Sequence, residues 1–191
     1  MREYIRMNAP GGVFFLTLVT FDRLPILADA GRIAGLRAAF RSVRAAHPFE
    51  IWGAVVLPDH LHVVIELPPG DSDFSTRVAL IKSRFSRIAS RDAIAEPAAS
   101  ASRQRRRERA VSQRRFWEHT IRDERDLDAH MDYIHYNPVK HRLAQCPHAW
   151  PWSSFGRWVR AGRYAGDWAC SCRRSVPPPS GLAMVVGDAG E

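Results

Sequence analysis

Two histidines separated by one residue are the first side chains in this sequence that could do chemistry. His60 and His62 follow a Pro58-Asp59 turn signal and open a run of apolar, β-branched residues, which predicts a strand. Side chains two positions apart on a strand point to the same side, with their Cα atoms roughly 6.6 Å apart. The two imidazoles can therefore share a metal ion. Two ligands do not complete a metal site, however, and a His-x-His pair taken alone is more often structural.

A tyrosine and an asparagine on a predicted helix could complete that site. Apolar residues recur at helical spacing from Asp123 to Asn137. On this helix Tyr133 and Asn137 stand one turn apart, on a line with Asp126 and His130 that borders the apolar stripe. If the helix packs beside the histidine strand, Asn137 can supply a third neutral ligand and Tyr133 can lie over the metal.

These residue types suit the cleavage of a phosphodiester. Two imidazoles and an amide leave a divalent cation its full charge and open positions, so the cation can polarise a phosphate oxygen. Two histidines alone favour zinc, whereas the added Asn137 amide and a phosphate oxygen favour Mg²⁺ or Mn²⁺. A tyrosine has an ordinary pKa of about 10, so it needs such a cationic neighbourhood to become a nucleophile. Tyr136 is the rival nucleophile, but helical spacing turns it toward solvent or DNA, so we assign this role to Tyr133.

The elements that must position these residues follow a recognisable order. Hydrophobic periodicity predicts strands over Val13 to Phe21, Ile51 to Leu57, Leu61 to Leu67 and Arg115 to Ile121, and helices over Asp29 to His47, Ser72 to about Arg91 and Asp123 to Asn137. Up to the last strand the order is β-α-β-β-α-β, the ferredoxin-like α+β arrangement of an antiparallel sheet with helices on one face. The tyrosine helix is appended, and Pro138 is expected to end it. The first strand is apolar almost throughout, which predicts a central strand.

The charge of the chain predicts a polyanionic partner. Lys and Arg number 28 against 20 Asp and Glu, a net charge of +8, so nucleic acid is the first candidate. Basic residues of the first two helices, Arg32 and Arg77 among them, are expected on the outer faces. Seven arginines lie between Arg103 and Arg115, within a segment, 93 to 115, that we predict to be a mobile loop. The residues expected to contact DNA are Arg84, Arg105, Arg106, Arg107, Arg114, Arg115, Tyr136 and Lys140.

The composition also limits the compartment and the number of domains. No apolar run approaches the roughly 20 residues that a membrane span needs, and we expect a cytoplasmic protein. Three cysteines argue against a disulfide framework, and the Cys170-x-Cys172 pair is weak evidence for zinc because a second pair at proper spacing is missing. One domain, 1 to 168, is predicted, followed by a loose tail, 169 to 191.

Aromatic residues alternate with arginines after the last helix. They could stack unpaired bases, but packing of this segment onto the domain is the favoured interpretation. The rings concerned are those of Trp150, Trp152, Phe155, Trp158, Tyr164 and Trp168.

Motifs at four places carry a resemblance to a known family. They are His60-Leu61-His62, the run from Tyr133 to Lys140, Gly11-Gly12 before the first strand, and the segment from Phe116 to Arg122. Together they resemble the REP-associated tyrosine transposases, relatives of the single-tyrosine insertion-sequence transposases in the HUH endonuclease superfamily. The resemblance covers roughly Tyr4 to Trp168 and leaves out the arginine-rich loop and the tail.

The resemblance implies a function and roles for particular residues. It implies cleavage and rejoining of single-stranded DNA at the foot of imperfect hairpins formed by repetitive extragenic palindromes, with Mg²⁺ or Mn²⁺. His60, His62 and Asn137 would be the metal ligands, and Tyr133 the nucleophile that stays on the 5′ side of the break. The protein is then expected at the bacterial nucleoid, acting as a monomer, with an exchanged dimer as the alternative.

Two departures and two other functions accompany this expectation. Asp59 stands where the resemblance implies asparagine, and His141-Arg142 where it implies glycine, which affects DNA contacts rather than the chemistry. The alternative function is that of a domesticated protein that binds hairpin DNA without cleaving it. A third candidate is a histidine-metal hydrolase, which would cleave through activated water and form no protein adduct.

Overall fold

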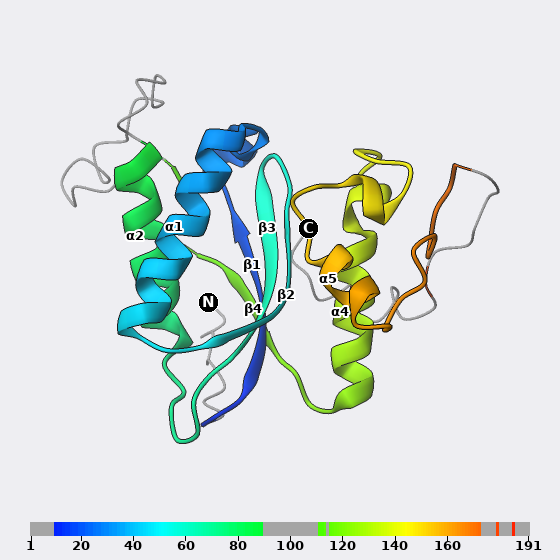
Figure 1. The fold of residues 1–191 in the computed structure, drawn as a ribbon. Helices are drawn as coiled ribbons and strands as arrows, with labels where there is room; N and C mark the ends of the chain where they lie inside the picture. The colour runs from blue at the N-terminus through cyan, green and yellow to red at the C-terminus, as the bar shows by residue number, and fades with distance from the viewer. Residues whose placement is uncertain (1–9, 90–110, 114, 173–178, 180–184, 186–191) are drawn as a thin grey trace, which may run out of the picture.

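A four-stranded antiparallel sheet forms the centre of the fold. The structure, a computed structural model, describes residues 10–89, 111–113, 115–172, 179 and 185. In sheet order the strands are β2 (Glu50–Val56), β3 (His60–Glu66), β1 (Val13–Val19) and β4 (Trp117–Thr120). The helices are α1 (Ala30–Ala46), α2 (Phe74–Ala89), α4 (Glu124–Lys140) and α5 (Phe155–Arg160), with the short 3-10 helices η1 (Phe21–Arg23), η2 (Ile26–Ala28) and η4 (Pro147–Ala149). This order confirms the predicted ferredoxin-like α+β arrangement (Figure 1).

Helices α1 and α2 cover one face of the sheet. Each begins at an aspartate: Asp29 accepts a hydrogen bond from the Arg32 backbone N–H, and Asp73 from that of Thr76, both at 2.9 Å. The apolar stripes of the two helices meet alternate residues of the central strands. The cluster that results includes Phe14, Leu16, Leu18, Leu61, Val63, Ile65, Leu36, Val43, Val78, Ile81 and Phe85.

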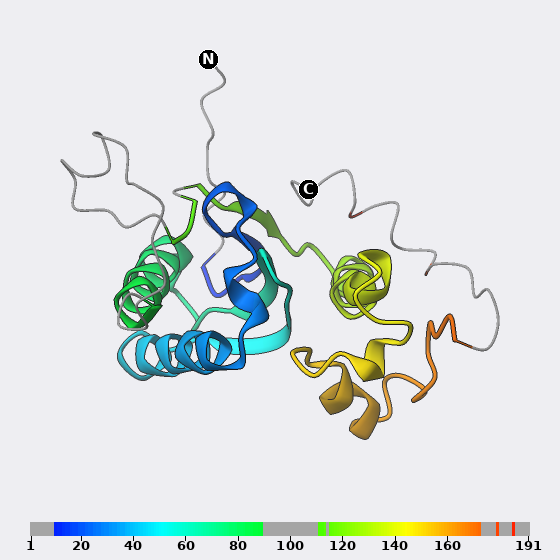
Figure 2. The same ribbon diagram turned by 90° about the horizontal axis from the view of Figure 1, so that it is seen from above.

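Helix α4 covers the opposite face. Phe15 and Val64 alternate along their strands with the residues of the first face, so their side chains point to the opposite face. There they pack against Met131 and Ile134 of α4. Strand β1 is therefore buried on both faces, as its apolar content predicts. Viewed from above, the sheet lies between the α1–α2 layer and the α4 layer, so the appended helix completes a third layer (Figure 2).

Helix α4 extends past the proline that was expected to end it. Pro138 lies inside the helix, and beyond it the His141 backbone N–H donates to the Asn137 carbonyl oxygen at 3.0 Å. A proline inside a helix removes one hydrogen bond and crowds the carbonyl four residues before it, but its fixed φ is compatible with a helix. One missing bond so near the end does not stop the helix, and the expectation was wrong by one turn.

Two arginines expected on outer faces are buried. The exposed fractions of Arg32 and Arg77 are 6% and 4%. Helical spacing gives the direction of a side chain but not what covers it, and at Arg77 the loop residues Pro48 and Asp71 do so. The Arg77 guanidinium donates to the Pro48 carbonyl oxygen at 2.8 Å and to the Asp71 carboxylate at 2.6 Å, so its charge is paired.

The segment after α4 packs along the edge strand β2. The Val56 backbone N–H donates to the Trp152 carbonyl oxygen at 2.9 Å, which covers part of the sheet edge. The indole N–H groups of Trp150 and Trp158 donate to the carbonyl oxygens of Val56 and Trp52, each at 2.9 Å. Packing is thus the observed role of these rings, and ring contacts also join Phe155, Tyr164 and Trp168.

The predicted mobile loop, 93–115, and the predicted loose tail, 169–191, fall largely outside the described residues. At the end of the loop, Val111 is buried in the cluster under α1 and α2. In the tail, Cys170 and Val185 are buried, so the chain is packed at these two positions. None of the described helices is both long enough and apolar enough to cross a membrane.

Candidate active site

Strand β3 brings the two predicted metal ligands to the face of the sheet beneath α4. His60 and His62 follow the Pro58-Asp59 turn and point to the same side of the strand, as their spacing predicts. Their ring centroids are 4.9 Å apart, and both side chains are buried. The pair can therefore converge on one ion.

Hydrogen bonds at Nδ1 orient both imidazoles. His62 Nδ1 lies 2.9 Å from Thr17 Oγ1, and His60 Nδ1 lies 2.6 Å from the Asp59 carboxylate. With Nδ1 engaged in this way, Nε2 is the ring nitrogen that would coordinate a metal, the arrangement usual around metal-bound histidines. Burial by itself raises the pKa of Asp59, but the hydrogen bond and charge of His60, helped by Arg23, hold that pKa below its usual value. The residue that departs from the family pattern thus orients a predicted ligand.

Helix α4 places Tyr133 against His62 within one chain. The two ring centroids are 5.1 Å apart at 72°, and Phe15 contacts the tyrosine ring from the sheet. Lys140, one of the predicted DNA contacts, lies over the tyrosine: its Nζ is 3.3 Å from the hydroxyl and 4.8 Å from the ring centroid. An ammonium in this position favours the phenolate form of Tyr133.

Asn137 is fully buried, and its amide oxygen and nitrogen have no hydrogen-bond partner among the described residues. Buried polar groups in folded proteins are nearly always bonded, and an unmet one costs about 1–3 kcal/mol. An amide kept at this cost one helical turn from Tyr133, whose ring contacts His62, fits a role as a ligand. The donor set of two imidazoles and one amide therefore suits a divalent cation.

His141 is a neighbour of the site that the sequence reasoning did not assign to it. Its ring centroid lies 5.3 Å from that of His60, at the C-terminal cap of α4. The available signal was its position one helical turn after Asn137, but Pro138 was expected to end the helix before that turn was complete. A third imidazole thus borders the predicted ligands.

A buried carboxylate lies behind the site. The Asp126 side chain bonds His119 Nε2 at 2.8 Å and lies 3.1 Å from His130 Nδ1, and it also accepts from the Arg122 backbone N–H. Burial alone raises the pKa of Asp126, but the hydrogen bonds from His119 and Arg122 outweigh it and hold that pKa at about 2. The His130 ring packs on Phe15, which in turn stacks on His62, so this group supports the site from one side.

The other predicted DNA contacts are dispersed. Tyr136 is half-buried against the apolar residues that lie between the sheet and α4. Arg84 lies on α2, in the layer across the sheet from Tyr133, and bonds Ser42 of α1. Arg115 is exposed just before β4. The remaining predicted contacts lie outside the described residues: Arg105, Arg106, Arg107 and Arg114.

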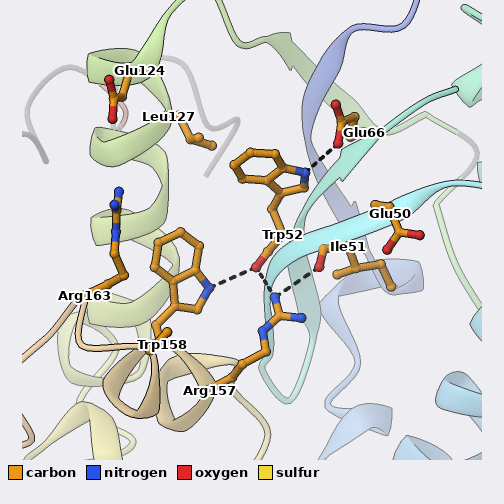
Figure 3. A pocket seen from close by; sticks show the side chains of 10 residues that line it. Glu50, Ile51, Trp52, Glu66, Glu124, Leu127, Arg157, Trp158 and Arg163 are labelled. Atoms are coloured by element: carbon orange, nitrogen blue, oxygen red, sulfur yellow. Dashed lines mark hydrogen bonds between the residues drawn. The ribbon is translucent and has the colours of Figure 1, made fainter. Parts of the chain in front are cut away.

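A hollow of about 730 Å³ lies elsewhere, between β2, α4 and α5 (Figure 3). Trp52 donates its indole N–H to Glu66 at 3.0 Å, and Trp158 and Arg157 donate to backbone carbonyl oxygens of β2. These groups hold α5 to the sheet edge. The hollow is therefore part of the attachment of the C-terminal segment and is separate from Tyr133.

Comparison with known proteins agrees with this architecture. The chain is 38% identical over 169 residues to the REP-associated tyrosine transposase of Escherichia coli K12, covering 88% of this chain and 92% of that protein. It is 40% identical to a Haemophilus influenzae protein of the same designation, covering 88% and 93%. A solved structure of a REP-associated tyrosine transposase bound to a REP hairpin superposes with a TM-score of 0.71 at 38% identity, covering 88% and 92%. No protein-family model matches the chain.

The fold and these relatives define the protein as a transposase, an enzyme of the tyrosine transposase kind. Within that class the chain belongs to the family of REP-associated tyrosine transposases. The family that the sequence motifs resemble is thereby confirmed, together with the α+β fold that the resemblance implies.

Proposed function

We propose that this transposase cleaves and rejoins single-stranded DNA at the foot of palindromic hairpins, through a covalent bond between Tyr133 and the 5′ side of the break. The observation that carries the proposal is the packing of Tyr133 against His62 within one chain, at a centroid distance of 5.1 Å. The relative whose structure contains a REP hairpin supports the choice of DNA. Because one chain brings both halves of the site together, we infer that the protein acts as a monomer. Its proposed DNA substrate places it at the nucleoid.

His60, His62 and Asn137 would hold the divalent cation, Mg²⁺ or Mn²⁺. Support comes from the anchored Nδ1 atoms of the histidines and from the buried amide of Asn137, which has no hydrogen-bond partner within the described part of the chain. When bound, the cation would supply positive charge to a non-bridging phosphate oxygen. The ligands are neutral, so they would not cancel that charge.

The chemistry at Tyr133 exchanges one phosphate ester for another. The phenolic oxygen forms a bond to phosphorus, the bond from phosphorus to the 3′ oxygen breaks, and the phenolic proton ends on the released 3′ hydroxyl. Lys140 Nζ, 3.3 Å from the phenolic oxygen, favours the nucleophilic form by its charge. Rejoining is the reverse reaction, in which another 3′ hydroxyl displaces the tyrosine.

Access to Tyr133 requires a local rearrangement. Its side chain is 0% exposed, so a phosphate reaches the hydroxyl only after groups around it move. This burial is also the observation that favours the second candidate function, a protein that binds hairpin DNA without cleaving it. The two functions differ in one product, the covalent adduct.

The test is incubation of the protein with labelled single-stranded hairpin DNA and Mn²⁺, followed by a denaturing gel. We expect a covalent protein–DNA band, which Tyr133→Phe abolishes and which a chelator prevents. Tyr136→Phe is the matched control, because it removes the neighbouring phenol of the same helix, and it should leave the band.

Three results would contradict the proposal. An adduct that survives Tyr133→Phe means another nucleophile. Salt-dependent binding of the hairpin with no adduct and no cleavage means the non-cleaving function. Cleavage without an adduct means attack by activated water.

A further inference from the structure

Three cysteines and a histidine meet beside η4, just after the C-terminal end of α4. The sulfur, nitrogen and sulfur atoms of Cys146, His148 and Cys170 lie within 4.8 Å of one another. Cys172 joins them, with its Sγ 3.1 Å from that of Cys146. His148 Nδ1 lies 3.5 Å from Cys170 Sγ. We call these four residues the cysteine cluster.

Backbone contacts hold the two halves of the cysteine cluster together. Cys146 and His148 belong to the N-cap and the turn of η4, directly after α4. Ser171, between the other two cysteines, donates its backbone N–H to the Gln145 carbonyl oxygen at 2.8 Å and its hydroxyl to the same oxygen at 2.9 Å. The chain reverses at Ala169, where φ is 53°, and so returns Cys170 to η4.

Two distances can be compared with the edges of a tetrahedral zinc site, and Cys172 lies outside the group whose ligand atoms are all within 4.8 Å of one another. Usual Zn–S and Zn–N bond lengths place two sulfurs about 3.8 Å apart and a sulfur and a nitrogen about 3.6 Å apart. The 3.5 Å between His148 and Cys170 equals such an edge, and the 3.1 Å between Cys146 and Cys172 needs a small adjustment. The sequence offers no second ligand pair at zinc-site spacing for Cys170 and Cys172. The fold supplies one, Cys146 and His148.

We propose that Cys146, His148, Cys170 and Cys172 bind one Zn²⁺ as a structural Cys₃His site. Thiolates select zinc over magnesium and manganese, so this site would not compete for the cation proposed at Asn137. Four protein ligands close the coordination sphere, as in structural rather than catalytic zinc sites. Cys172 and His148 are exposed, so the ion has a path of entry. Binding at Nδ1, which now lies 3.1 Å from the Gly166 carbonyl oxygen, would require the His148 tautomer that carries its proton on Nε2, and the cysteines would release their thiol protons.

Zinc here would fasten the C-terminal segment to the tyrosine helix. Cys146 and Cys172 are 26 positions apart, and the chain between them contains α5 and the aromatic rings that pack on α4. Tyr164 of this segment donates to Asp132 of α4 at 2.8 Å. The metal would close the segment into a loop and so stabilise its contacts with α4.

The test measures zinc in the full chain purified without a metal-binding tag, in a His60→Ala, His62→Ala background that removes the candidate active site. We expect one zinc ion per chain. Cys172→Ser and His148→Ala, both changes at exposed residues, should each weaken zinc affinity by at least about tenfold, whereas His47→Ala at the end of α1 should not. Replacement of zinc by Co²⁺ should give the visible absorption of a tetrahedral thiolate complex.

A disulfide between Cys146 and Cys172 is the alternative to the zinc site. The His148→Ala variant distinguishes them, because zinc binding needs His148 and the disulfide does not. Thiol titration of the unfolded, unreduced chain should give three thiols if zinc is bound, and one if the disulfide forms. The proposal is wrong if the chain carries no zinc, if only one thiol reacts, or if zinc content is unchanged in both cluster variants.

Discussion

The amide of Asn137 marks the site at the scale of single residues. It is fully buried without a partner among the described residues, one turn from Tyr133, while the two histidines opposite have fixed orientations. Asp59 shows a related effect, because the residue that departs from the family pattern orients His60. Each of these groups has a chemical explanation that packing alone does not supply.

Replacing Asn137 separates its two roles. Asn137→Leu removes, at similar volume, a buried polar group that has no hydrogen-bond partner among the residues the structure describes, so the free energy of unfolding without metal should rise by about 1–3 kcal/mol. The same change should abolish the Mn²⁺-dependent adduct, because a ligand is lost. Urea unfolding and the adduct assay measure the two effects.

Asn137→Asp is the companion variant, since it keeps an oxygen ligand. It should retain measurable metal-dependent activity while Asn137→Leu has none. Loss of stability in Asn137→Leu with the adduct unchanged would show that the amide is structural.

At the scale of elements, the approach of α4 to the sheet decides the site. Gly53 on β2 faces Met131 of α4, and a Cβ at this glycine would lie 2.1 Å from Met131 Cε and 2.6 Å from its Sδ. Met131 is fully buried, so its side chain would have to shift within the packed core to admit a methyl group. The glycine therefore lets the helix come close enough for Tyr133 to touch His62.

Gly53→Ala should displace α4 and reduce the rate of adduct formation by about 10- to 100-fold, because small misplacements of reacting groups are costly. The matched control is Gly35→Ala between α1 and α2, where a Cβ would lie 2.8 Å from Ile88 Cγ2. That change should lower the melting temperature while leaving the rate per folded molecule unchanged. Equal effects of both changes on the rate would count against this explanation.

At the scale of the whole molecule, the third layer links function to stability. Helix α4 is covered by the sheet on one side and by α5 and its aromatic rings on the other. His135 lies in this second contact, with Nε2 2.9 Å from Ser154 Oγ and its ring against Phe155 and Tyr164. Burial, and to a smaller degree the charge of Arg157, lowers the pKa of His135 to about 3.

The stability of the protein should therefore fall with acidity. The folded protein keeps His135 neutral, while the unfolded chain takes up a proton near pH 6.5. The contribution of His135 to the free energy of unfolding is therefore complete above pH 6.5 and is lost as the pH falls toward 3. The loss amounts to about 1.4 kcal/mol per pH unit between about pH 6 and 4.

Urea unfolding of the parent and of His135→Gln over this range checks the expectation. In His135→Gln the free energy of unfolding should fall less steeply with decreasing pH than in the parent. His47→Gln, at the end of α1, should keep the slope of the parent. Parallel slopes for parent and His135→Gln would rule out the assigned cause.

The sequence alone determined the elements and the local geometry of the site residues. Strand alternation placed His60 and His62 on one side, and helical spacing placed Tyr133 and Asn137 one turn apart, because both depend only on nearby backbone geometry. Motif similarity added the family. The roles of these residues in cleavage are still predictions.

The tertiary structure alone decided what each element meets. It showed that α4 covers the second face of the sheet, that Lys140 lies on Tyr133, and that His141 borders His60. It buried Arg77 and brought Cys146 to Cys172, which no local pattern pairs. Such contacts join segments far apart in the chain, and their partners are chosen by packing of the whole molecule rather than by the spacing of neighbouring residues. The residues of the candidate site, two histidines on a strand and a tyrosine on a helix, come together only through such a contact.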